Sequence, residues 1–329
     1  MEPSTYVCDH DAQHPTTRRP FFSLDEVLMG KTFVMSGGSR QGGISRRAVE
    51  MAICFGARVA FIDKDPIDAN FLNGLPAGKA LYFRGDLRQP ETAQEFLAQV
   101  VNEFGLPNVV VNIAGGSDGI CNFQDVSYNE LISVFEVNVG TASNLVSAAL
   151  PFLMRQSGDK SIVSIGSVTG LVTGDLREAH YGAAKAALAS LAKSWANEFA
   201  PFGIRSNLIA SGSVPNPFSK VWNPRLNDPR CHEHILDRIP LGRLGTPEDI
   251  GNCILFLASP LSSWITGQVV CVDGGMIFAG RGDIRPDGKW YLPREDDQFV
   301  QRSYDLDRSH DPETTAAAGS GMRSEGGKS

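Results

Sequence analysis

The feature that most restricts the fold of this chain is a regular alternation of short apolar runs with longer amphipathic segments between residues 30 and 280. The runs predict strands, and the spacing of apolar residues between them predicts helices. The predicted strands are Lys31–Ser36, Arg58–Asp63, Ala80–Arg84, Asn108–Ile113, Ser161–Ile165, Ile204–Ile209 and Val269–Val272; the predicted helices are Arg46–Phe55, Thr92–Phe104, Asn129–Arg155, Tyr181–Phe199 and one that begins after Thr246. Strands separated by helices form βαβ units, so we expect an α/β fold with a doubly wound parallel sheet.

The chain outside this alternation is polar. We expect a single domain at 29–280, with a substrate lid at about 213–239, a mobile extension at 1–28 and a partly disordered extension at 281–329. The last residues are small and polar, as in disordered tails. The stretch 281–307 carries four aromatic residues, so packing on the domain as a strap stays an open alternative.

The charge and the cysteines narrow the class of protein. The 329 residues include 30 Lys+Arg and 37 Asp+Glu, a net charge of −7, which argues against a nucleic-acid or anionic-membrane partner. No signal peptide and no continuous apolar run long enough to cross a bilayer is apparent. The six cysteines form no C-x-x-C pair, which favours reduced thiols and a cytoplasmic protein.

A glycine-rich stretch, Ser36 to Ser45, lies between the first predicted strand and its helix. Glycines here allow a tight turn and let a pyrophosphate approach the helix N-terminus, where free N–H groups attract anions. A flexible turn alone would also explain glycines, but the acidic residues that follow favour a dinucleotide site of the Rossmann type. The candidate cofactor-binding residues in this stretch are Gly37, Ser39, Arg40, Gly43 and Ile44.

Two carboxylates support the same interpretation. Asp63 ends the second predicted strand, where it could accept the hydroxyls of an adenosine ribose, and Asp86, followed by Leu87, lies where the adenine edge would bind. A carboxylate repels a 2′-phosphate, so Asp63 favours NAD over NADP. Arg40 and Lys64 act in the opposite direction, and NADP stays possible.

The most informative pair is Tyr181 and Lys185. A spacing of four puts both side chains on the same face of a helix, one turn apart. A cation beside a phenol favours the phenolate and brings the pKa of the phenol toward neutrality, which suits a general acid/base. Ser167 follows a predicted strand and could reach the same place, and Asn138 lies among apolar neighbours within a predicted helix, which indicates a buried role.

Taken together, these motifs resemble the short-chain dehydrogenase/reductase family of NAD(P)-dependent oxidoreductases. The resemblance runs from about Gly30 to Met276, and the 3-oxoacyl-carrier-protein reductase branch is the nearest. It implies that Tyr181 is the acid/base, Lys185 supports it and binds the nicotinamide ribose, Ser167 bonds the substrate oxygen, and Asn138 holds a relay water. It also implies cofactor contacts from Asn112, Ala114, Gly115, Gly212 and Val214, a homodimer or homotetramer, and no metal.

The chain departs from the family pattern at several positions. Ser36 replaces the usual Thr, two residues are added in the glycine-rich stretch, and Ser45 replaces its last Gly, so we expect this loop to sit differently. Ile113 replaces a second Asn, and Asn216 aligns with the Thr that commonly binds the carboxamide. The Tyr-x-x-x-Lys spacing argues against the enoyl-reductase branch.

Three weaker possibilities remain beside the oxidoreductase. The cluster Cys231–His234 resembles metal ligands in composition but has no distant fourth ligand, so we expect no metal there. A cofactor-binding scaffold or regulatory protein with impaired turnover is the main alternative, and a non-redox enzyme on bound NAD is another. Apolar residues in the predicted lid at 218–238 suggest a hydrophobic or acyl small-molecule substrate.

Overall fold

The computed structural model describes residues 27–117, 122–171, 178–215 and 235–277. Most of the predicted N-terminal extension, all of the predicted C-terminal extension and most of the predicted lid lie outside these ranges, as do Asn216 and the cluster at 231–234. Within the predicted N-terminal extension, Val27 and Leu28 are described, and both are buried against the sheet.

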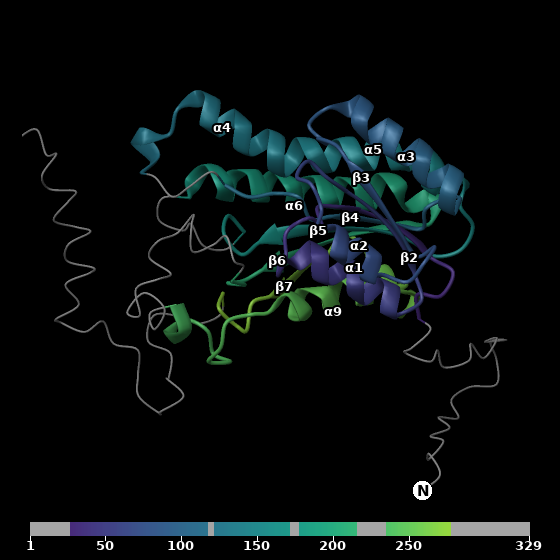
Figure 1. Cartoon of the computed structure of the whole chain (residues 1–329). Coiled ribbons are helices and arrows are strands. Elements are labelled where there is room, and N and C mark those ends of the chain that lie inside the picture. The colour runs from purple at the N-terminus through teal and green to yellow at the C-terminus, as the bar shows by residue number, and fades with distance from the viewer. Residues whose placement is uncertain (1–26, 118–121, 172–177, 216–234, 278–329) are drawn as a thin grey trace, which may run out of the picture. The chain divides into compact units, whose positions relative to one another are not determined.

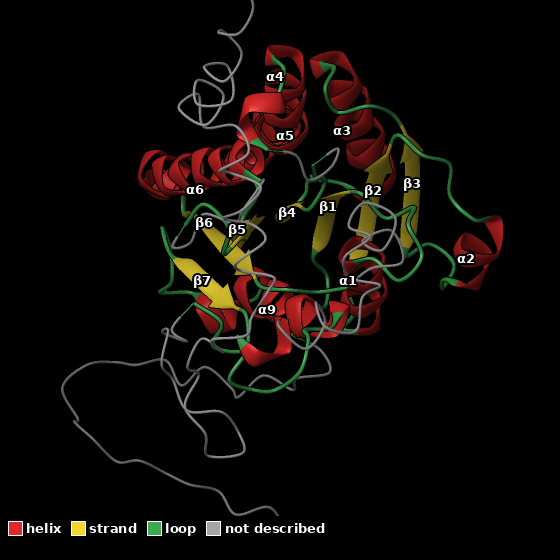
Figure 2. Ribbon diagram, turned by 90° about the vertical axis from the view of Figure 1, so that its left-hand side faces the viewer, coloured by secondary structure: helices red, strands yellow, loops and turns green. Residues whose placement is uncertain are grey.

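The described residues form a seven-stranded sheet in the order β3-β2-β1-β4-β5-β6-β7, and every neighbouring pair is parallel. Figure 2 shows the twist of this sheet between its helices. The strands are β1 Thr32–Ser36, β2 Arg58–Asp63, β3 Ala80–Arg84, β4 Val109–Asn112, β5 Lys160–Ser167, β6 Ile204–Ser211 and β7 Val269–Val272. The predicted α/β doubly wound parallel sheet is therefore confirmed.

Helices cover both faces of the sheet. Helices α3, α4, α5 and α6 lie on one face, and α1 and α9 lie together on the other (Figures 1 and 2). The α-helices are α1 Ile44–Cys54, α2 Ala69–Gly74, α3 Pro90–Phe104, α4 Tyr128–Phe135, α5 Thr141–Arg155, α6 Ala179–Phe199 and α9 Pro247–Ala258. Short helical turns are η2 Phe123–Asp125, η4 Ala200–Phe202 and η6 Pro260–Ser262, and η3 Glu136–Gly140 is a π-helical turn.

The predicted long helix at Asn129–Arg155 is present as one helical run, Tyr128–Arg155, whose geometry changes at its centre. Its first part begins at Ser127, which forms a capping box with Glu130. Its centre is the π-turn η3, which contains Asn138. Single π-turns inside helices are rare and occur frequently at functional sites, so the interruption itself marks this position.

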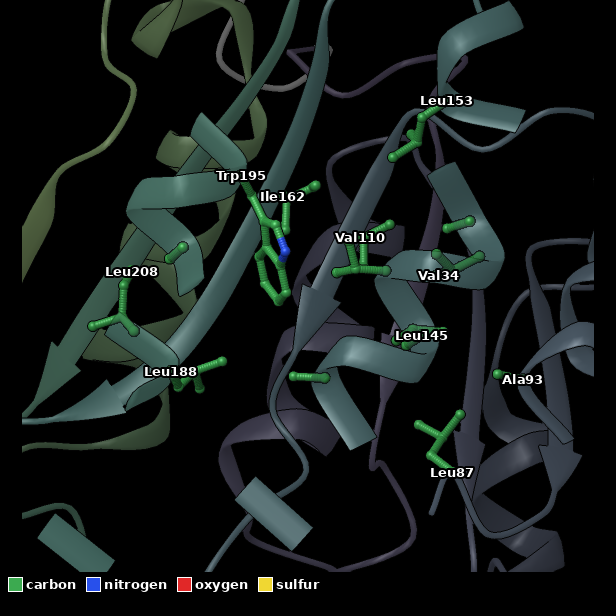
Figure 3. Packing of buried hydrophobic residues seen from close by; sticks show 14 of the residues in the cluster. Val34, Leu87, Ala93, Val110, Leu145, Leu153, Ile162, Leu188, Trp195 and Leu208 are labelled. Carbon is green, nitrogen blue, oxygen red and sulfur yellow. The ribbon is translucent and has the colours of Figure 1, made fainter. Parts of the chain in front are cut away.

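Two apolar layers hold the sheet between its helices. On one face, Val34, Val110 and Ile162 of the central strands pack toward α5 and α6, where Leu145, Leu188 and Trp195 lie (Figure 3). On the other face, Phe33, Met35 and Val111 pack against α1 and α9. Since central strands of a parallel sheet are buried on both faces, their continuous apolar character follows from their place.

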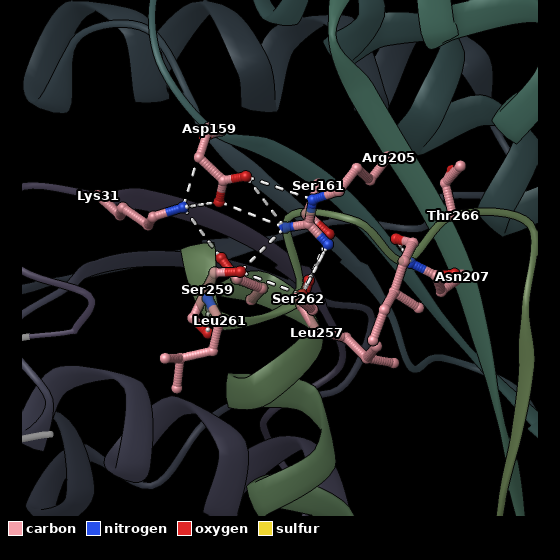
Figure 4. A network of polar contacts seen from close by, with 12 residues as sticks. Lys31, Asp159, Ser161, Arg205, Asn207, Leu257, Ser259, Leu261, Ser262 and Thr266 are labelled. Atoms are coloured by element: carbon pink, nitrogen blue, oxygen red, sulfur yellow. Dashed lines mark hydrogen bonds and ion pairs between the residues drawn. The ribbon is translucent and has the colours of Figure 1, made fainter. Parts of the chain in front are cut away.

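A buried polar cluster closes the amino ends of the central strands. We call Lys31, Asp159 and Arg205 the basal cluster (Figure 4). Lys31 Nζ lies 2.6 Å from the Asp159 carboxylate, and Arg205 Nη2 lies 3.2 Å from it. Both cations also donate to carbonyl groups at the C-terminal end of α9, of Ala258 and of Leu257, respectively. Cations complement the negative end of a helix, so this cluster joins β1, β5, β6 and α9.

One described helical run, Tyr128–Arg155, is long and apolar enough to cross a membrane by length and composition alone. This run comprises α4, η3 and α5, whose buried residues pack on the sheet beside α3 and α6. The apolar side of this helical run therefore faces the sheet, as in a helix that packs in a protein core.

Candidate functional site

The predicted site residues gather at the carboxyl ends of the strands. The loops after β1, β2, β4 and β5 emerge at this edge, and α6 brings Tyr181 and Lys185 to it. In open parallel sheets ligands bind at this edge, next to the point where the strand order reverses. Here that point lies between β1 and β4.

Lys185 connects α6 to the end of β5. Its side chain is 3% exposed, and Nζ donates to the carbonyl oxygen of Ile165 at 2.9 Å. The same Nζ lies 5.6 Å from the centroid of the Tyr181 ring, one turn away on α6. Burial lowers the pKa of Lys185 to about 8. The predicted pairing of these two side chains on one helix face is therefore present.

Asn138 joins the π-turn to the loop after β4. Its Nδ2 donates to the carbonyl oxygens of Gly116 at 2.6 Å and Val134 at 2.8 Å, and its Oδ1 accepts from Gly116 N–H at 3.0 Å. The side chain is fully buried, as the sequence predicted. Because Nδ2 bonds the carbonyl four residues earlier, the Asn138 side chain itself stabilises the interrupted helix.

Gly115 lies between the catalytic candidates. A Cβ added there would be 2.6 Å from Asn138 Oδ1 and 2.9 Å from Lys185 Nζ. Only a glycine therefore allows the loop after β4 to approach both side chains this closely. The spacing of Gly115 after β4 places Ala114 beside it at the same edge.

Ser167 ends β5, two residues beyond Ile165, so their side chains share one side of the strand. Its Oγ accepts from Thr169 N–H at 3.1 Å, and its side chain is half-buried. The structure thus places Ser167 at the same edge as Lys185, with its hydroxyl hydrogen available to a further acceptor.

Ser36 links the loops after β1 and β4. Its buried Oγ accepts from the backbone N–H groups of Ile113 at 2.8 Å and Ala114 at 2.9 Å. The sequence analysis treated Ser36 only as a departure from the family pattern and missed this role. The signal was available, because a hydroxyl at the end of a strand can satisfy the backbone of a neighbouring loop.

Asn112 ends β4 and is 2% exposed. Its Nδ2 donates to Ser164 Oγ at 3.1 Å, while Oδ1 has no hydrogen-bond partner within the part of the chain that the structure describes. A buried acceptor without a partner is costly, and such atoms often mark a place where a ligand or water binds.

The glycine-rich loop accommodates Ser45, which stands where the family pattern has its last Gly. Ser45 lies in the first turn of α1, and its Oγ is 3.1 Å from the place a Cβ of Gly37 would take. Gly37 also has a φ of 84°. Both this positive φ and the lack of room for a Cβ favour glycine at position 37. Gly43 and Ile44 begin α1, whose first N–H groups face the loop without a side-chain cap. The expected change in the loop is therefore local, and the helix N-terminus stays open to an anion.

Asp63, at the end of β2, already has donors around it. Its Oδ2 accepts from Ser39 N–H at 3.0 Å and from Ser39 Oγ–H at 2.7 Å, and its Oδ1 accepts from Asp65 N–H at 3.1 Å. Arg40 lies 3.7 Å from the Asp65 carboxylate. The structure thus brings Ser39, Arg40 and Asp63 together, as the sequence predicted.

Asp86 and Leu87 follow β3. Leu87 is buried in the core, and its carbonyl oxygen accepts from Asn144 Nδ2 at 2.8 Å. The Asp86 carboxylate accepts from the backbone and the guanidinium of Arg88, with Nη2 at 2.6 Å, and this hydrogen bonding lowers the pKa of Asp86. The sequence analysis missed both partners: Arg88 is only two residues from Asp86, whereas Asn144 is brought to this turn by the fold.

Gly212 and Val214 follow β6. A Cβ at Gly212 would lie 2.6 Å from Asp273 Cα, and Val214 packs within the apolar layer beside Gly245. The Asp273 carboxylate accepts from the N–H groups of Gly275 and Ile277, which closes the turn after β7. Both predicted cofactor residues are therefore held on the edge formed by β6 and β7.

Comparison with protein families finds one match over residues 37–277, to a family described as enoyl-(acyl carrier protein) reductase. The chain is also 36% identical over 258 residues to the L-rhamnose 1-dehydrogenase (NAD(P)(+)) of a Sphingomonas species, covering 76% of this chain and 98% of that one. It is 32% identical to the 3-oxoacyl-acyl-carrier-protein reductase of Thermotoga maritima, covering 76% and 99%.

Among solved structures, the ligand-free aldohexose dehydrogenase of Thermoplasma acidophilum matches with a TM-score of 0.67 and 26% identity, covering 78% of this chain and 97% of that one. These relatives are covered nearly end to end, at 97–99% of their length. The similarity therefore extends over the sheet and both helical layers rather than over a nucleotide-binding segment alone.

Proposed function

This chain belongs to the short-chain dehydrogenase/reductase family, as an NAD(P)-dependent oxidoreductase, and from that premise we propose that Tyr181 is its general acid/base in the interconversion of a secondary alcohol and a ketone. In the direction of reduction, the Tyr181 hydroxyl gives a proton to the substrate oxygen; in the direction of oxidation, the phenolate removes it. The nicotinamide, when bound, accepts or supplies the hydride.

The observation that carries this proposal is the buried Lys185 ammonium beside Tyr181. Nζ is held by the Ile165 carbonyl at 2.9 Å and lies 5.6 Å from the phenol ring. A cation held in an apolar place favours the phenolate without needing any movement during the reaction. We propose that Lys185 also bonds the nicotinamide ribose, that Ser167 donates to the substrate oxygen, and that Asn138 holds a relay water.

The residues present fit a dinucleotide. The open N-terminus of α1 suits a pyrophosphate, and Gly115, without a side chain, lets the loop after β4 lie directly against Asn138 and Lys185. We propose that the glycine-rich loop from Gly37 to Ile44 holds the pyrophosphate and that Asp86 and Leu87 bind the adenine. We propose that Asn112, Ala114 and Gly115, with Gly212 and Val214, surround the nicotinamide.

We propose a preference for NAD over NADP, because the Asp63 carboxylate at the end of β2 repels a 2′-phosphate. We propose that the preference is incomplete, since the Arg40 guanidinium lies 3.7 Å from the Asp65 carboxylate, two residues after Asp63. The L-rhamnose 1-dehydrogenase relative is named for both cofactors, which supports an incomplete preference.

A second candidate substrate class is the cyclic hemiacetal of a sugar. The L-rhamnose 1-dehydrogenase relative and the aldohexose dehydrogenase structure support it. The ring carbon of a hemiacetal carries a hydroxyl and a hydrogen, so the same acid/base and hydride acceptor would produce a lactone. The 3-oxoacyl-acyl-carrier-protein reductase supports the first candidate, a ketone.

We propose that the protein works in the cytoplasm as a homodimer or homotetramer, with contacts through α4, α5 and α6. Tyr128 at the start of α4 is 74% exposed and Ile132, one turn later, is 39% exposed. Aromatic and aliphatic residues are enriched in interfaces of this kind, and the family resemblance gave the same expectation.

The proposal is tested by nicotinamide fluorescence and turnover. We expect NADH to bind wild type and Tyr181→Phe with similar affinity, while only wild type oxidises secondary alcohols or sugars with NAD. If the two proteins turn over equally, the Tyr181 role is wrong. If NADH binds but wild type shows no turnover, the cofactor-binding scaffold alternative replaces the oxidoreductase.

A further inference from the structure

The carboxylate of Asp63 is already largely occupied by the chain itself. A carboxylate offers about four lone-pair positions to donors. Ser39 uses both positions of Oδ2, through its backbone N–H and its hydroxyl, and Asp65 N–H uses one position of Oδ1. One position, on Oδ1, is left for a ligand. A ribose has two hydroxyls at this place, so the second has no vacant acceptor on Asp63.

The shape of the glycine-rich loop explains how Ser39 reaches Asp63. Gly37 N–H donates to the carbonyl of Ile62 at 2.7 Å, which binds the loop to the end of β2. A Cβ at Gly38 would lie 2.6 Å from the Phe61 ring, so the backbone rests directly on β2. Ser39 is the next residue and therefore lies over the end of that strand.

The two added residues complete this arrangement. Gly43 N–H donates to the Arg40 carbonyl at 3.2 Å, and Gly42 has a φ of 70°. A positive φ at this position is what a type II turn requires. The turn takes up the extra length between Arg40 and α1, so that Ser39 can stay on Asp63 while α1 keeps its N-terminus.

We propose that Ser39 is a specificity-determining residue that acts through Asp63: by occupying one carboxylate oxygen, it leaves Asp63 able to bond one ribose hydroxyl instead of two and so reduces discrimination between NAD and NADP. This inference rests on the proposed contact between Asp63 and the cofactor ribose. Ser39 then differs from the loop residues that we propose to hold the pyrophosphate.

Arg40 works in the same direction from the other side. Its ion pair with Asp65 spans 3.7 Å, and each side chain is 46% exposed. An exposed pair of this kind contributes little free energy, and it keeps the guanidinium near the end of β2, where a 2′-phosphate would bind. The chain thus weakens the favourable contact with NAD and keeps a cation within reach of NADP.

The test is the ratio of NADPH to NADH dissociation constants, measured by nicotinamide fluorescence on the full chain. Ser39→Ala removes the hydroxyl and keeps the backbone N–H that orients Asp63. The freed lone pair can accept a second ribose hydroxyl, and a hydrogen bond to a charged group supports about a three- to tenfold increase in NADH affinity. We expect NADPH binding to stay equal or to weaken, so the ratio rises by about the same factor.

Ser39→Thr is the matched control, because it keeps the hydroxyl and should keep the wild-type ratio. A merely structural role of Ser39 would lower the unfolding temperature of Ser39→Ala and leave the ratio unchanged, and this result would overturn the proposal. A fall in the ratio would overturn it as well.

Asp63→Asn separates this inference from the function on which it rests. If Asp63→Asn lowers the ratio and Ser39→Ala does not raise it, the Ser39 inference alone fails. If Asp63→Asn leaves the ratio unchanged, the proposed ribose contact fails, and the inference fails with it. In the Asp63→Asn background, Ser39→Ala should have no further effect; a further shift would mean that Ser39 contacts the cofactor directly, which contradicts the proposal.

Discussion

The two edges of the sheet use polar groups in opposite ways. At the amino edge, the basal cluster gives each charge of Lys31, Asp159 and Arg205 a partner, and carbonyls of α9 take further N–H groups. At the carboxyl edge, Asn112 Oδ1 has no partner among the described residues, and the buried Lys185 ammonium donates to a backbone carbonyl rather than to a carboxylate. Both edges are built on the same strands.

The amino edge therefore contributes mainly to stability, and the carboxyl edge mainly to binding and catalysis. Satisfied buried charges hold strands and helix together, and removing one partner leaves the others uncompensated. Polar groups without a partner in the chain are available to a ligand. They stabilise the fold less than they would if they were paired within the chain. A substitution at the amino edge should therefore change unfolding, and one at the carboxyl edge should change binding or turnover.

The largest effect is expected for Tyr181→Phe. Loss of a general acid/base should lower kcat by about 10²- to 10⁴-fold. The hydroxyl adds little to packing, so the unfolding temperature should stay close to that of wild type. Steady-state rates and thermal unfolding check this together. A large fall in unfolding temperature would mean that the carboxyl edge is also a stability element, which would break the comparison.

Next in size is Asp159→Ala, which leaves Lys31 and Arg205 without their carboxylate. Breaking such a cluster should cost about 3 kcal/mol of unfolding free energy, or roughly 6–12 °C in unfolding temperature for a domain of this size. Well below that temperature, kcat and KM should not change. The matched control is Glu50→Gln, which breaks the exposed pair with Arg47 and should cost less than about 1 kcal/mol.

A smaller effect concerns pH. Since the pKa of Lys185 is about 8, its proton leaves as the pH rises through this value, and ketone reduction should slow over the same range. Lys185→Arg keeps the charge and should move the decline to higher pH. Rates of both proteins across the range from neutral to alkaline pH check this. An unchanged midpoint in Lys185→Arg would assign the decline to another group.

The same pKa affects stability with a definite sign. The folded chain binds fewer protons at Lys185 than the unfolded chain between pH 8 and 10.5, so the unfolding free energy rises with pH across that window. Lys185→Met should remove this contribution, as chemical denaturation at several pH values would show. A steeper rise in Lys185→Met than in wild type would contradict the assigned direction.

The smallest effect is expected at Asp86. Its exposed pair with Arg88 must open before adenine can use the carboxylate, and Arg88→Ala removes that competition. NADH affinity should rise by no more than about fivefold, the value of an exposed ion pair. Reduced nicotinamide mononucleotide has no adenine, and its affinity should stay the same. An equal change for both nucleotides would show that Arg88 acts elsewhere.

Much of the fold was predictable because the sequence signals are local. Arg58–Asp63 and Val269–Val272 have the predicted bounds, and α9 begins at Pro247 after the Thr246 cap, where Asp249 completes a capping box. The sequence identified Tyr181 and Lys185 because residues four apart on a helix lie on the same face, one turn from each other.

The features of the fold and the site that the sequence did not predict depend mostly on contacts between distant parts of the chain. The π-turn at Asn138 needs the backbone of Gly116, which is 22 residues away, so no local pattern predicts it. Helix α2 has six residues, too few for a periodic pattern of apolar residues. Its one local signal is the N-cap residue Asp68. The bonds of Ser36 and Asn144 likewise reach across 77 and 57 residues.

The strand order has a consequence for how the protein is made. Strands β1, β2 and β3 pair within the first third of the sequence, and β4 to β7 pair within the rest; within the described sheet, the β1–β4 pairing joins these two groups of strands. The proposed cofactor site lies on this seam, where Ser36 bonds the loop after β4. A nascent chain therefore holds half of a nucleotide site until β4 leaves the ribosome, and pairing across such a separation is slow. The order of synthesis thus makes the binding site a late product of folding.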